Sequence, residues 1–486
     1  MFSMFHNLQV DLRNCRKMGL PFTVAIIGNI VSLLVLSLIF ASGLVLPAFA
    51  QQLGVTPTPS HASRTLRFDW PALEIGSATY EEGPTGVTVF HFPGRVMASV
   101  DVRGAGPGTV NTDLIRMDKP SKEVDTIVFS GGSLLGLEAI AGSATALKDS
   151  GERSGDDMPI SAGAIMYDLH YHRLNDIYPD KALAAAALKA RKPGLFPLGA
   201  EGAGRMVMQG LFYDCGTHSG QGAAFRQIGD LKIAVFVAVN ALGTIVDRQG
   251  KVVKCPSNPK WKPGVSISEL MSTVGPDVGT DPAPPPPEGS KKVDENTTIS
   301  LVVVNRKMTP WELQRMAIEV HTSMARAIQP FSTVDDGDTI FVATTEEVGP
   351  TAGGLSRGAL NLTASDMMWD AILSSVPDEP QPIFTTPPPV TVPPKSLAKL
   401  AGNYKFSHDQ LVDIREKNGV LMVRNTGPGF FDLLHDYWVP LTPVSDKEFY
   451  VKSQFHTRIG FVFSSAGEVT GAVVNPGRWG LKGQKQ

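Results

Sequence analysis

The residues with the clearest chemical potential lie at the junction Glu295-Asn296-Thr297-Thr298, where a Pro-rich stretch meets a run of β-branched residues. If the chain is cut before Thr297, that residue gains a free α-amine with a pKa of about 8, able to accept the proton of its own hydroxyl. One residue then supplies both the nucleophile and the base. The cut could be autocatalytic, with the Thr297 hydroxyl attacking the Asn296 carbonyl, an acyl shift from nitrogen to oxygen, and release by water. The same residues also satisfy the N-x-[ST] glycosylation pattern, so the pair alone leaves both interpretations open.

Four further side chains could assist a nucleophile at this position. Asp336 and Asp338 precede the next strand and could orient or charge the ammonium group of Thr297. Asn240 follows a strand-like run and could donate its side-chain amide to an oxyanion. Tyr167 could offer a phenolic donor. Each also has an ordinary interpretation: acids in an Asp-Gly turn, a strand-end Asn, and a half-buried Tyr.

Several other catalytic signatures are missing from the sequence, which contains no H-E-x-x-H, P-loop or C-x-x-C motif. Gly104, Gly106 and Gly108 lack the strand-to-helix setting of a dinucleotide fingerprint and are interpreted as loop residues. His170 and His172 have no nearby Cys or acidic cluster to complete a metal site. We therefore expect neither a metal nor a cofactor.

The elements that must position these residues begin with a block from Leu66 to Leu270. It mixes β-rich runs such as 233–239 with helical ones such as 180–189, which indicates an α+β or layered α/β domain. Segment 297–304 then predicts a strand, and 338–344 a second one. Both must belong to the sheet of the preceding block, because two strands and two helices are too few to bury a sheet alone.

Two helices are predicted around these strands. Thr309-Pro310-Trp311-Glu312 forms a capping box with Pro at the first helical position, so a helix begins there and continues until Pro330. Its apolar stripe consists of Leu313, Met316, Ala317, Val320, Met324, Ala327 and Ile328. Segment 364–376 predicts the closing helix.

The N-terminal segment 1–50 indicates export. Basic residues at 13, 16 and 17 precede an uncharged stretch that ends in Ala48-Phe49-Ala50, the layout of a cleaved signal peptide. The uncharged stretch is also long enough for an uncleaved membrane anchor, which would be the only contact with a membrane. Either way the remainder faces an oxidising compartment, where Cys215 and Cys255 could pair or remain two separate buried thiols.

Composition and Pro-rich tracts divide the rest of the chain. A formal net charge of −3 argues against a nucleic-acid partner. The tracts at 275–289 and 377–394 predict solvated linkers. The Asn418-Gly419 pair between alternating strands is typical of a hairpin, and the final segment of about ninety residues predicts an antiparallel barrel or sandwich. The expected parts are 51–296 and 297–381 as two subunits of one catalytic domain, a linker at 382–395, and a C-terminal β-barrel at 396–486.

The sequence resembles the β-peptidyl aminopeptidases (L-aminopeptidase/D-esterase type) and, more closely, the nylon-oligomer (6-aminohexanoate oligomer) hydrolases. The similarity covers roughly residues 66–376. It is carried by Tyr80–Gly86, Ser130–Gly132, Tyr178–Leu183, Gly220–Arg226, Ile245–Arg248, Asn296–Ile299 and Asp336–Asp338.

This resemblance implies a four-layer αββα sandwich of the N-terminal-nucleophile type, self-cleaved at Asn296-Thr297, that hydrolyses amides through an acyl-enzyme. By position, Thr297 is the implied nucleophile, Asn240 the oxyanion donor, Tyr167 a substrate-side residue, and Asp336 with Asp338 the acidic pair. The implied substrate is a small peptide or oligoamide, and the implied assembly is a homo-oligomer of processed heterodimers.

Two departures from the family pattern bear on function. Leu211 stands where the nylon-oligomer branch carries a Lys, which changes the charge of the site and affects substrate preference. The signal segment and the C-terminal ninety residues are additions, and the latter resemble the small β-barrel of some penicillin-binding-protein-like serine hydrolases. The alternative functions are a binding protein of the cell envelope on a catalytically drifted scaffold, and acyl transfer to an amine.

Overall fold

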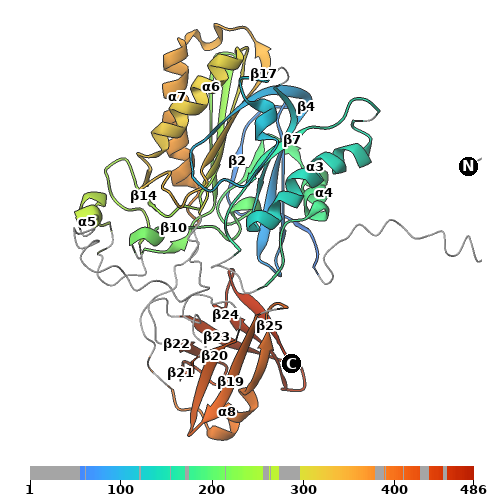
Figure 1. Ribbon diagram of the computed structural model, residues 1–486. Helices are drawn as coiled ribbons and strands as arrows, with labels where there is room; N and C mark the ends of the chain where they lie inside the picture. Colours follow the sequence, from blue (N-terminus) through green and yellow to red (C-terminus); the bar gives the residue numbers. More distant parts are fainter. Residues whose placement is uncertain are drawn as a thin grey trace, which may run out of the picture. The chain divides into compact units, whose positions relative to one another are not determined.

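The computed structural model describes residues 55–60, 62–119, 122–153, 155–169, 175–213, 215–255, 262, 264–272, 296–377, 388, 390–408, 410–426, 437–451 and 457–486 (Figure 1). The expected signal segment, the histidines at 170 and 172, and the first Pro-rich tract lie outside these residues. Among the helices described, none is both long and apolar enough to cross a bilayer.

The larger domain is built on strands that pair in the order β12-β13-β15-β17-β4-β6-β7-β5. Their bounds are β12 (Gln221–Ile228), β13 (Leu231–Ala238), β15 (Ile299–Arg306), β17 (Thr339–Val348), β4 (Thr85–Val102), β6 (Glu123–Ser130), β7 (Ser161–Ile165) and β5 (Thr109–Val110). Strands β3 (Glu74–Tyr80), β1 (Thr58–Pro59) and β8 (Lys192–Pro193) branch from this path through β4.

Strand β4 divides this path into two layers. Its first half, Thr85 to His91, pairs with β3 and β6, and its end, from Met97 to Val102, pairs with β17. Pro93 lies between the halves, where the register with β6 shifts, because proline has no N–H for the ladder. One strand therefore contributes to both sheets.

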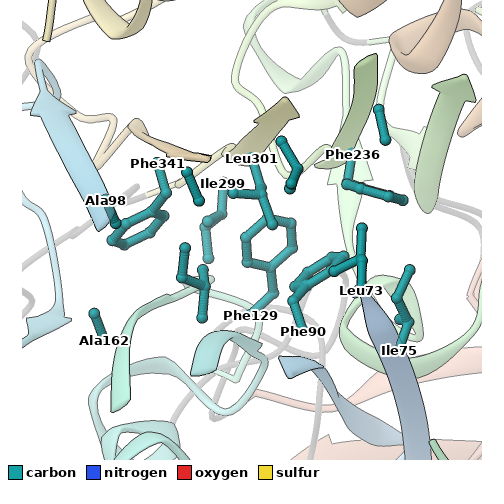
Figure 2. Close-up of a cluster of buried hydrophobic side chains, with 14 of the residues drawn as sticks. Leu73, Ile75, Phe90, Ala98, Phe129, Ala162, Phe236, Ile299, Leu301 and Phe341 are labelled. Atoms are coloured by element: carbon teal, nitrogen blue, oxygen red, sulfur yellow. The ribbon is translucent and has the colours of Figure 1, made fainter. Parts of the chain in front are cut away.

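The core between the two sheets is aromatic. Phe236 of β13, Leu301 of β15 and Phe341 of β17 point toward Phe90 of β4 and Phe129 of β6 (Figure 2). Because strand side chains alternate, the neighbouring residues of β13, β15 and β17 pack on the opposite face against helices α6 (Pro310–Met324) and α7 (Arg357–Ser374). The outer face of the other sheet packs against α3 (Leu137–Ser150) and α4 (Lys181–Ala190).

These layers form the αββα sandwich that the sequence predicts, with α6 and α7 on one side and α3 and α4 on the other (Figure 1). Strand β15 pairs with β13 and β17, and β17 pairs with β4, which confirms that the 297–376 unit completes the sheet of the preceding block. Strands β15 and β17 run parallel, so their N-terminal ends meet at the same edge.

Helix boundaries follow local capping. The capping box at Thr309 and Glu312 is present, as predicted, but α6 ends at Met324, before Pro330. Helix α7 begins at Arg357, earlier than residue 364, because Ser356 caps it by accepting from the Ala359 N–H. Its first turns contain polar residues that interrupt the apolar stripe, and this interruption hid the true start of the helix.

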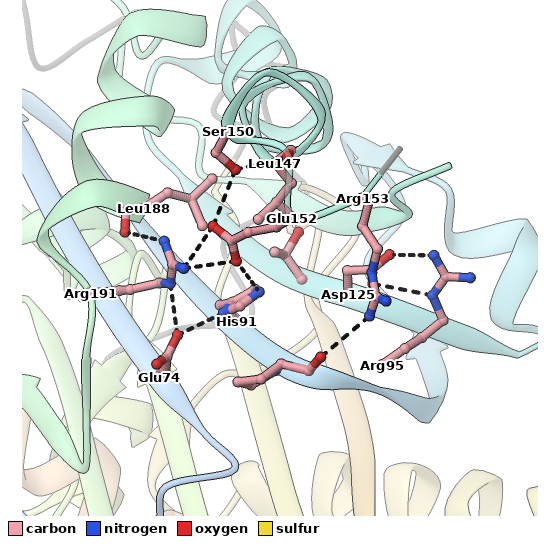
Figure 3. Close-up of polar contacts among 12 residues, drawn as sticks. Glu74, His91, Arg95, Asp125, Leu147, Ser150, Glu152, Arg153, Leu188 and Arg191 are labelled. Atoms are coloured by element: carbon pink, nitrogen blue, oxygen red, sulfur yellow. Dashed lines mark hydrogen bonds and ion pairs between the residues drawn. The ribbon is translucent and has the colours of Figure 1, made fainter. Parts of the chain in front are cut away.

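Ionic contacts fasten α3 and α4 to the sheet (Figure 3). Arg191, which caps α4, bonds Glu74 of β3 at 2.7 Å and Glu152 beyond α3 at 2.8 Å. His91 of β4 lies between the same two carboxylates. These contacts lie on the outer face of the β3–β4 layer.

Short elements complete the domain. They are the pairs β10 (Met208–Gln209) with β11 (Thr217–His218), β14 (Thr244–Ile245) with β16 (Ile328–Gln329), and β2 (Thr65–Arg67) with β9 (Leu195–Pro197), and helix α5 (Ile267–Ser272). Cys215 and Cys255 form a disulfide, which decides between the two states that the sequence left open.

The C-terminal part is a closed antiparallel barrel that follows helix α8 (Pro394–Leu400). Its strands are β18 (Gly402–Lys405), β19 (Leu411–Lys417), β20 (Val420–Asn425), β21 (Val439–Pro443), β22 (Glu448–Val451), β23 (Arg458–Phe463), β24 (Val469–Val474) and β25 (Leu481–Lys485). The predicted hairpin turn is confirmed, since Asn418 and Gly419 have φ values of 55° and 79° between β19 and β20.

Candidate active site

Thr297 lies just before β15, in the edge where β15 and β17 begin. Asn296 and Thr297 are joined by a peptide bond in the structure, so the geometry is that of the uncut chain. The Thr297 side chain is fully buried, and its N–H donates to the Asn240 carbonyl at 2.8 Å. Its hydroxyl oxygen has no hydrogen-bond partner among the described residues. Such an unpaired buried hydroxyl is costly in a folded protein and typical of a functional site.

The carbonyl of Asn296 is held by the segment before β17. Its oxygen accepts a hydrogen bond from the Gly337 N–H at 2.6 Å, and the Asn296 N–H donates to the Asp335 carbonyl at 2.9 Å. A Cβ at Gly337 would lie 2.5 Å from the Thr297 hydroxyl oxygen and 2.7 Å from the Gly106 carbonyl oxygen. Only glycine therefore allows a backbone N–H to reach the Asn296 carbonyl beside the hydroxyl.

The two aspartates stand on either side of Gly337 and are both buried. Asp338 accepts from the Thr298 N–H at 2.7 Å and from the Ser332 N–H at 3.0 Å. Asp336 accepts from the Thr333 N–H at 2.8 Å. Burial and then the charge of Asp336 raise the pKa of Asp338, while burial is the main cause that raises the pKa of Asp336. The pair therefore resists full ionisation.

The loop after β4 hydrogen-bonds to the segment Asp336–Asp338. Gly104 donates its N–H to the Asp338 carbonyl at 3.3 Å, and Gly106 donates to the Asp336 carbonyl at 3.1 Å. A Cβ at Gly104 would lie 2.3 Å from the Asp336 carbonyl oxygen. These glycines were correctly interpreted as loop residues, but their part in the site was missed. The signal was their spacing, because repeated glycines allow close backbone contact.

Asn240 is fully buried and is held at both ends of its carboxamide. Its Oδ1 accepts from the Met208 N–H at 3.1 Å, and its Nδ2 donates to the Tyr167 carbonyl at 3.1 Å. An amide nitrogen carries two hydrogens, so Nδ2 has a second hydrogen beyond the one in the bond to Tyr167. Its backbone carbonyl accepts from the Thr297 N–H, and Asn240 therefore contacts the nucleophile position directly.

Thr297, Asn240, Asp336, Asp338 and Tyr167 are thus connected through a few hydrogen bonds. The contact that links Tyr167 to Asn240 is made by the Tyr167 backbone carbonyl, whereas its phenol was the group expected to act. Buried polar atoms without partners among the described residues gather at the same place, on Asn296, Thr297, Thr298 and Asp336.

Leu211 lies in a short 3-10 turn, Leu211–Tyr213, which contacts the segment after Asn240 through the Phe212 N–H, a donor to the Leu242 carbonyl at 3.0 Å. It packs so closely on Gly216 that a Cβ there would lie 2.8 Å from a Leu211 methyl. The position expected to carry a Lys is therefore filled by apolar packing. In the described part of the chain, no group of three or more His, Cys, Asp or Glu side chains is arranged to hold a metal ion.

Comparison with known proteins places this geometry in a family. Residues 68–378 match the model of peptidase family S58. The chain belongs to peptidase family S58. It is 40% identical over 332 residues to the 6-aminohexanoate-oligomer endohydrolase of Paenarthrobacter ureafaciens, an alignment that covers 66% of this chain and 88% of that protein.

More distant members are also similar. An uncharacterized aminopeptidase of Mycobacterium leprae is 30% identical over 286 residues, covering 55% of this chain and 72% of the relative. The solved β-aminopeptidase of Burkholderia sp. is 16% identical and superposes with a TM-score of 0.43, covering 65% of this chain and 88% of that one. Membership of the family makes this chain a peptidase or amidase.

Proposed function

We propose that this S58 protein cuts its own Asn296–Thr297 bond and then hydrolyses amides through an acyl-enzyme on Thr297. One observation carries the proposal. A backbone N–H, that of Gly337, lies 2.6 Å from the carbonyl oxygen of Asn296, while the adjoining Thr297 hydroxyl is buried without a partner among the described residues. A donor on the carbonyl oxygen beside an unpaired hydroxyl is the arrangement that acyl transfer requires.

In the first reaction, Thr297 Oγ1 bonds to the Asn296 carbonyl carbon, and the oxygen of that carbonyl becomes an oxyanion that Gly337 stabilises. The C–N bond then breaks, the hydroxyl proton passes to the departing nitrogen, and an ester forms between Asn296 and Thr297. Water hydrolyses the ester, which leaves a carboxylate on Asn296 and a free amine on Thr297.

In the second reaction, the new amine is the base for its own hydroxyl. It begins next to the Asn240 carbonyl, which accepts from the same nitrogen in the uncut chain. Two ionised aspartates would raise the pKa of the amine, but the raised pKa of Asp338 keeps part of that negative charge neutralised. We therefore expect acylation to rise between about pH 6 and 8 as the ammonium loses its proton.

The oxyanion of the second reaction needs a donor of its own. Asn240 has one Nδ2 hydrogen beyond the one that it gives to Tyr167, and its backbone carbonyl accepts from the Thr297 N–H. We assign this hydrogen to the substrate carbonyl. Self-cleavage and hydrolysis then share a nucleophile and use different donors.

The substrate class that we propose is a small amide with an aliphatic backbone, such as an oligoamide or an N-terminal amino acid amide. The support is the 40% sequence identity to a 6-aminohexanoate-oligomer endohydrolase and the apolar side chain of Leu211 at the position where a Lys was expected. Single-turnover acylation of the processed protein with a panel of amides and esters tests this directly. Acylation of Thr297, seen as a mass increase on the fragment that begins there, is the expected result. A processed protein that no substrate acylates would instead favour the binding-protein function.

We also propose that the protein is exported, on the strength of the signal-like segment 1–50 and the Cys215–Cys255 disulfide. A reporter fused after Pro57 should be active outside the cytoplasmic membrane. Recovery of the native chain in cytosol with Met1 intact, and without membrane association, would contradict export.

A further inference from the structure

We propose that the loop between β24 and β25 of the barrel is a positioning element of the active site, and that it acts by holding the β10–β11 hairpin against Asn240. Trp479, in that loop, is the central residue. The inference rests on the proposed function, since it concerns the donor assigned to amide hydrolysis. The match to family S58 ends at residue 378, so this element lies outside the matched region.

The first contact joins the barrel to the hairpin. The Trp479 ring stacks on His218 of β11, with 4.1 Å between ring centroids and 2° between ring planes. Within the hairpin, His218 is the register partner of Met208 on β10. A flat stack of this kind fixes the ring of His218 and limits the movement of the strand that carries it.

The second contact joins the hairpin to the catalytic residue. Met208 donates its N–H to the Oδ1 of Asn240 at 3.1 Å, and its carbonyl accepts from the Ala241 N–H at 2.9 Å. Because an N–H donor needs an acceptor, the Met208 N–H must face the carboxamide oxygen of Asn240, and this bond fixes the positions of Oδ1 and Nδ2. Nδ2 then faces Tyr167, where it donates to the backbone carbonyl at 3.1 Å. If Met208 moves away, the amide can rotate and lose its donor geometry.

A second clamp holds the same loop from the other side. Arg205, only 1% exposed, donates to the Arg478 carbonyl at 2.6 Å and bonds Glu81 at 2.7 Å. Arg478 in turn donates to the Ala200 carbonyl at 2.6 Å. Burial favours neutral Glu81, but the hydrogen bonds and charge of Arg205 outweigh it and hold the Glu81 pKa below its ordinary value. The barrel loop is thus tied to the chain on both sides of Met208.

The contacts of Trp479 lead through His218 and Met208 to Asn240, and Gly337 is not among these residues. Gly337 lies between Asp336 and Asp338, whose backbone carbonyls accept from the N–H groups of Gly106 and Gly104. These contacts come from the loop after β4 and not from the barrel. Loosening the barrel loop should therefore weaken hydrolysis and spare self-cleavage. A barrel that only stabilised the fold would affect both reactions together.

The test is Trp479→Ala in the full-length chain, with wild type measured alongside. We expect self-cleavage after cell-free translation at the wild-type rate. The single-turnover acylation rate at saturating substrate should fall by roughly tenfold to a hundredfold, with little change in the half-saturating concentration, as for a slightly misplaced catalytic group. Trp479→Phe, which keeps a ring to stack on His218, should restore most of that rate.

His408→Ala is the matched control. His408 also lies in the barrel part and contacts the catalytic domain, through Asp176 at 2.8 Å, but neither residue is connected to the hairpin by the contacts above. We expect it to acylate at the wild-type rate. Equal acylation by Trp479→Ala and wild type would overturn the inference, as would parallel loss of self-cleavage and acylation in Trp479→Ala. If wild type itself is not acylated, the proposed function fails, and that outcome is separate.

Discussion

Replacing Asn240 with Ala should separate the two reactions that we propose for this protein. In the proposed self-cleavage, negative charge develops on the carbonyl oxygen of Asn296, which accepts from the Gly337 N–H at 2.6 Å. Hydrolysis depends on the second Nδ2 hydrogen of Asn240 in our assignment. We therefore expect Asn240→Ala to process itself and then fail to turn over substrate at a useful rate.

The size of the effect follows from the number of donors removed. One preorganised oxyanion donor contributes about 3–4 kcal/mol, so acylation should slow by roughly 10²–10³-fold. The substitution also leaves the Met208 N–H and the Tyr167 carbonyl without their side-chain partner, at about 1–3 kcal/mol of folding stability each. A lowered melting temperature is therefore expected in the same variant.

The control for that instability is Asn305→Ala. Asn305, at the far end of β15, is buried and bonds two backbone groups in the same way, the Lys232 N–H at 2.7 Å and the Asp230 carbonyl at 2.9 Å. Asn305→Ala should lower the free energy of unfolding by a similar amount without changing the contacts of the site. The assay is a time course of self-cleavage by gel, followed by single-turnover acylation of the processed fraction.

Two results would refute this reasoning. If Asn240→Ala remains uncut although it is as stable as Asn305→Ala, then Asn240 is also needed for self-cleavage of the precursor. Full acylation by processed Asn240→Ala would show that another group stabilises the oxyanion.

Three further predictions concern the scaffold of the site. In Gly337→Ala the new Cβ lies 2.5 Å from the Thr297 hydroxyl oxygen, so self-cleavage should slow by roughly a hundredfold or more in a pulse-chase assay; wild-type kinetics would contradict the assigned donor. Cys215→Ser opens a 40-residue loop and should lower the free energy of unfolding by about 4 kcal/mol in urea titration; an unchanged midpoint would contradict it. Because the pKa of Asp338 is raised in the folded state, its protonated form contributes stability that is fully present below about pH 4 and is lost as pH rises through the native pKa. The melting temperature of uncut Thr297→Ala should therefore fall more steeply with rising pH than that of Thr297→Ala combined with Asp338→Asn. Equal slopes would refute this prediction.

Sequence reasoning reached the elements whose causes are local. The Thr309 capping box starts a helix through bonds within one turn, and Asn418-Gly419 forms its hairpin through residues that tolerate positive φ. The run of β-branched residues at 297–304 predicted a strand in the sheet of the preceding block, and β15 is that strand. For these elements, composition and spacing were enough.

The details of the site depend on contacts between distant segments, which spacing cannot reveal. The Met208 N–H that orients Asn240 comes from a residue 32 positions away. Gly337 meets the Asn296 carbonyl only because β15 and β17 pair in parallel in one particular register. The stack of Trp479 on His218 joins the barrel to the catalytic domain and leaves no local pattern. Such contacts follow from the assembled fold.

The most direct test of the central claim is the intact mass and N-terminal sequence of the purified protein, compared with Thr297→Ala. We predict that wild type yields two non-covalently associated fragments, the second beginning at Thr297, and that Thr297→Ala remains one uncut chain. Cleavage at Asn296 that persists in Thr297→Ala, or a wild-type chain that stays whole, would contradict the assignment of Thr297 as the nucleophile that processes and then operates this enzyme.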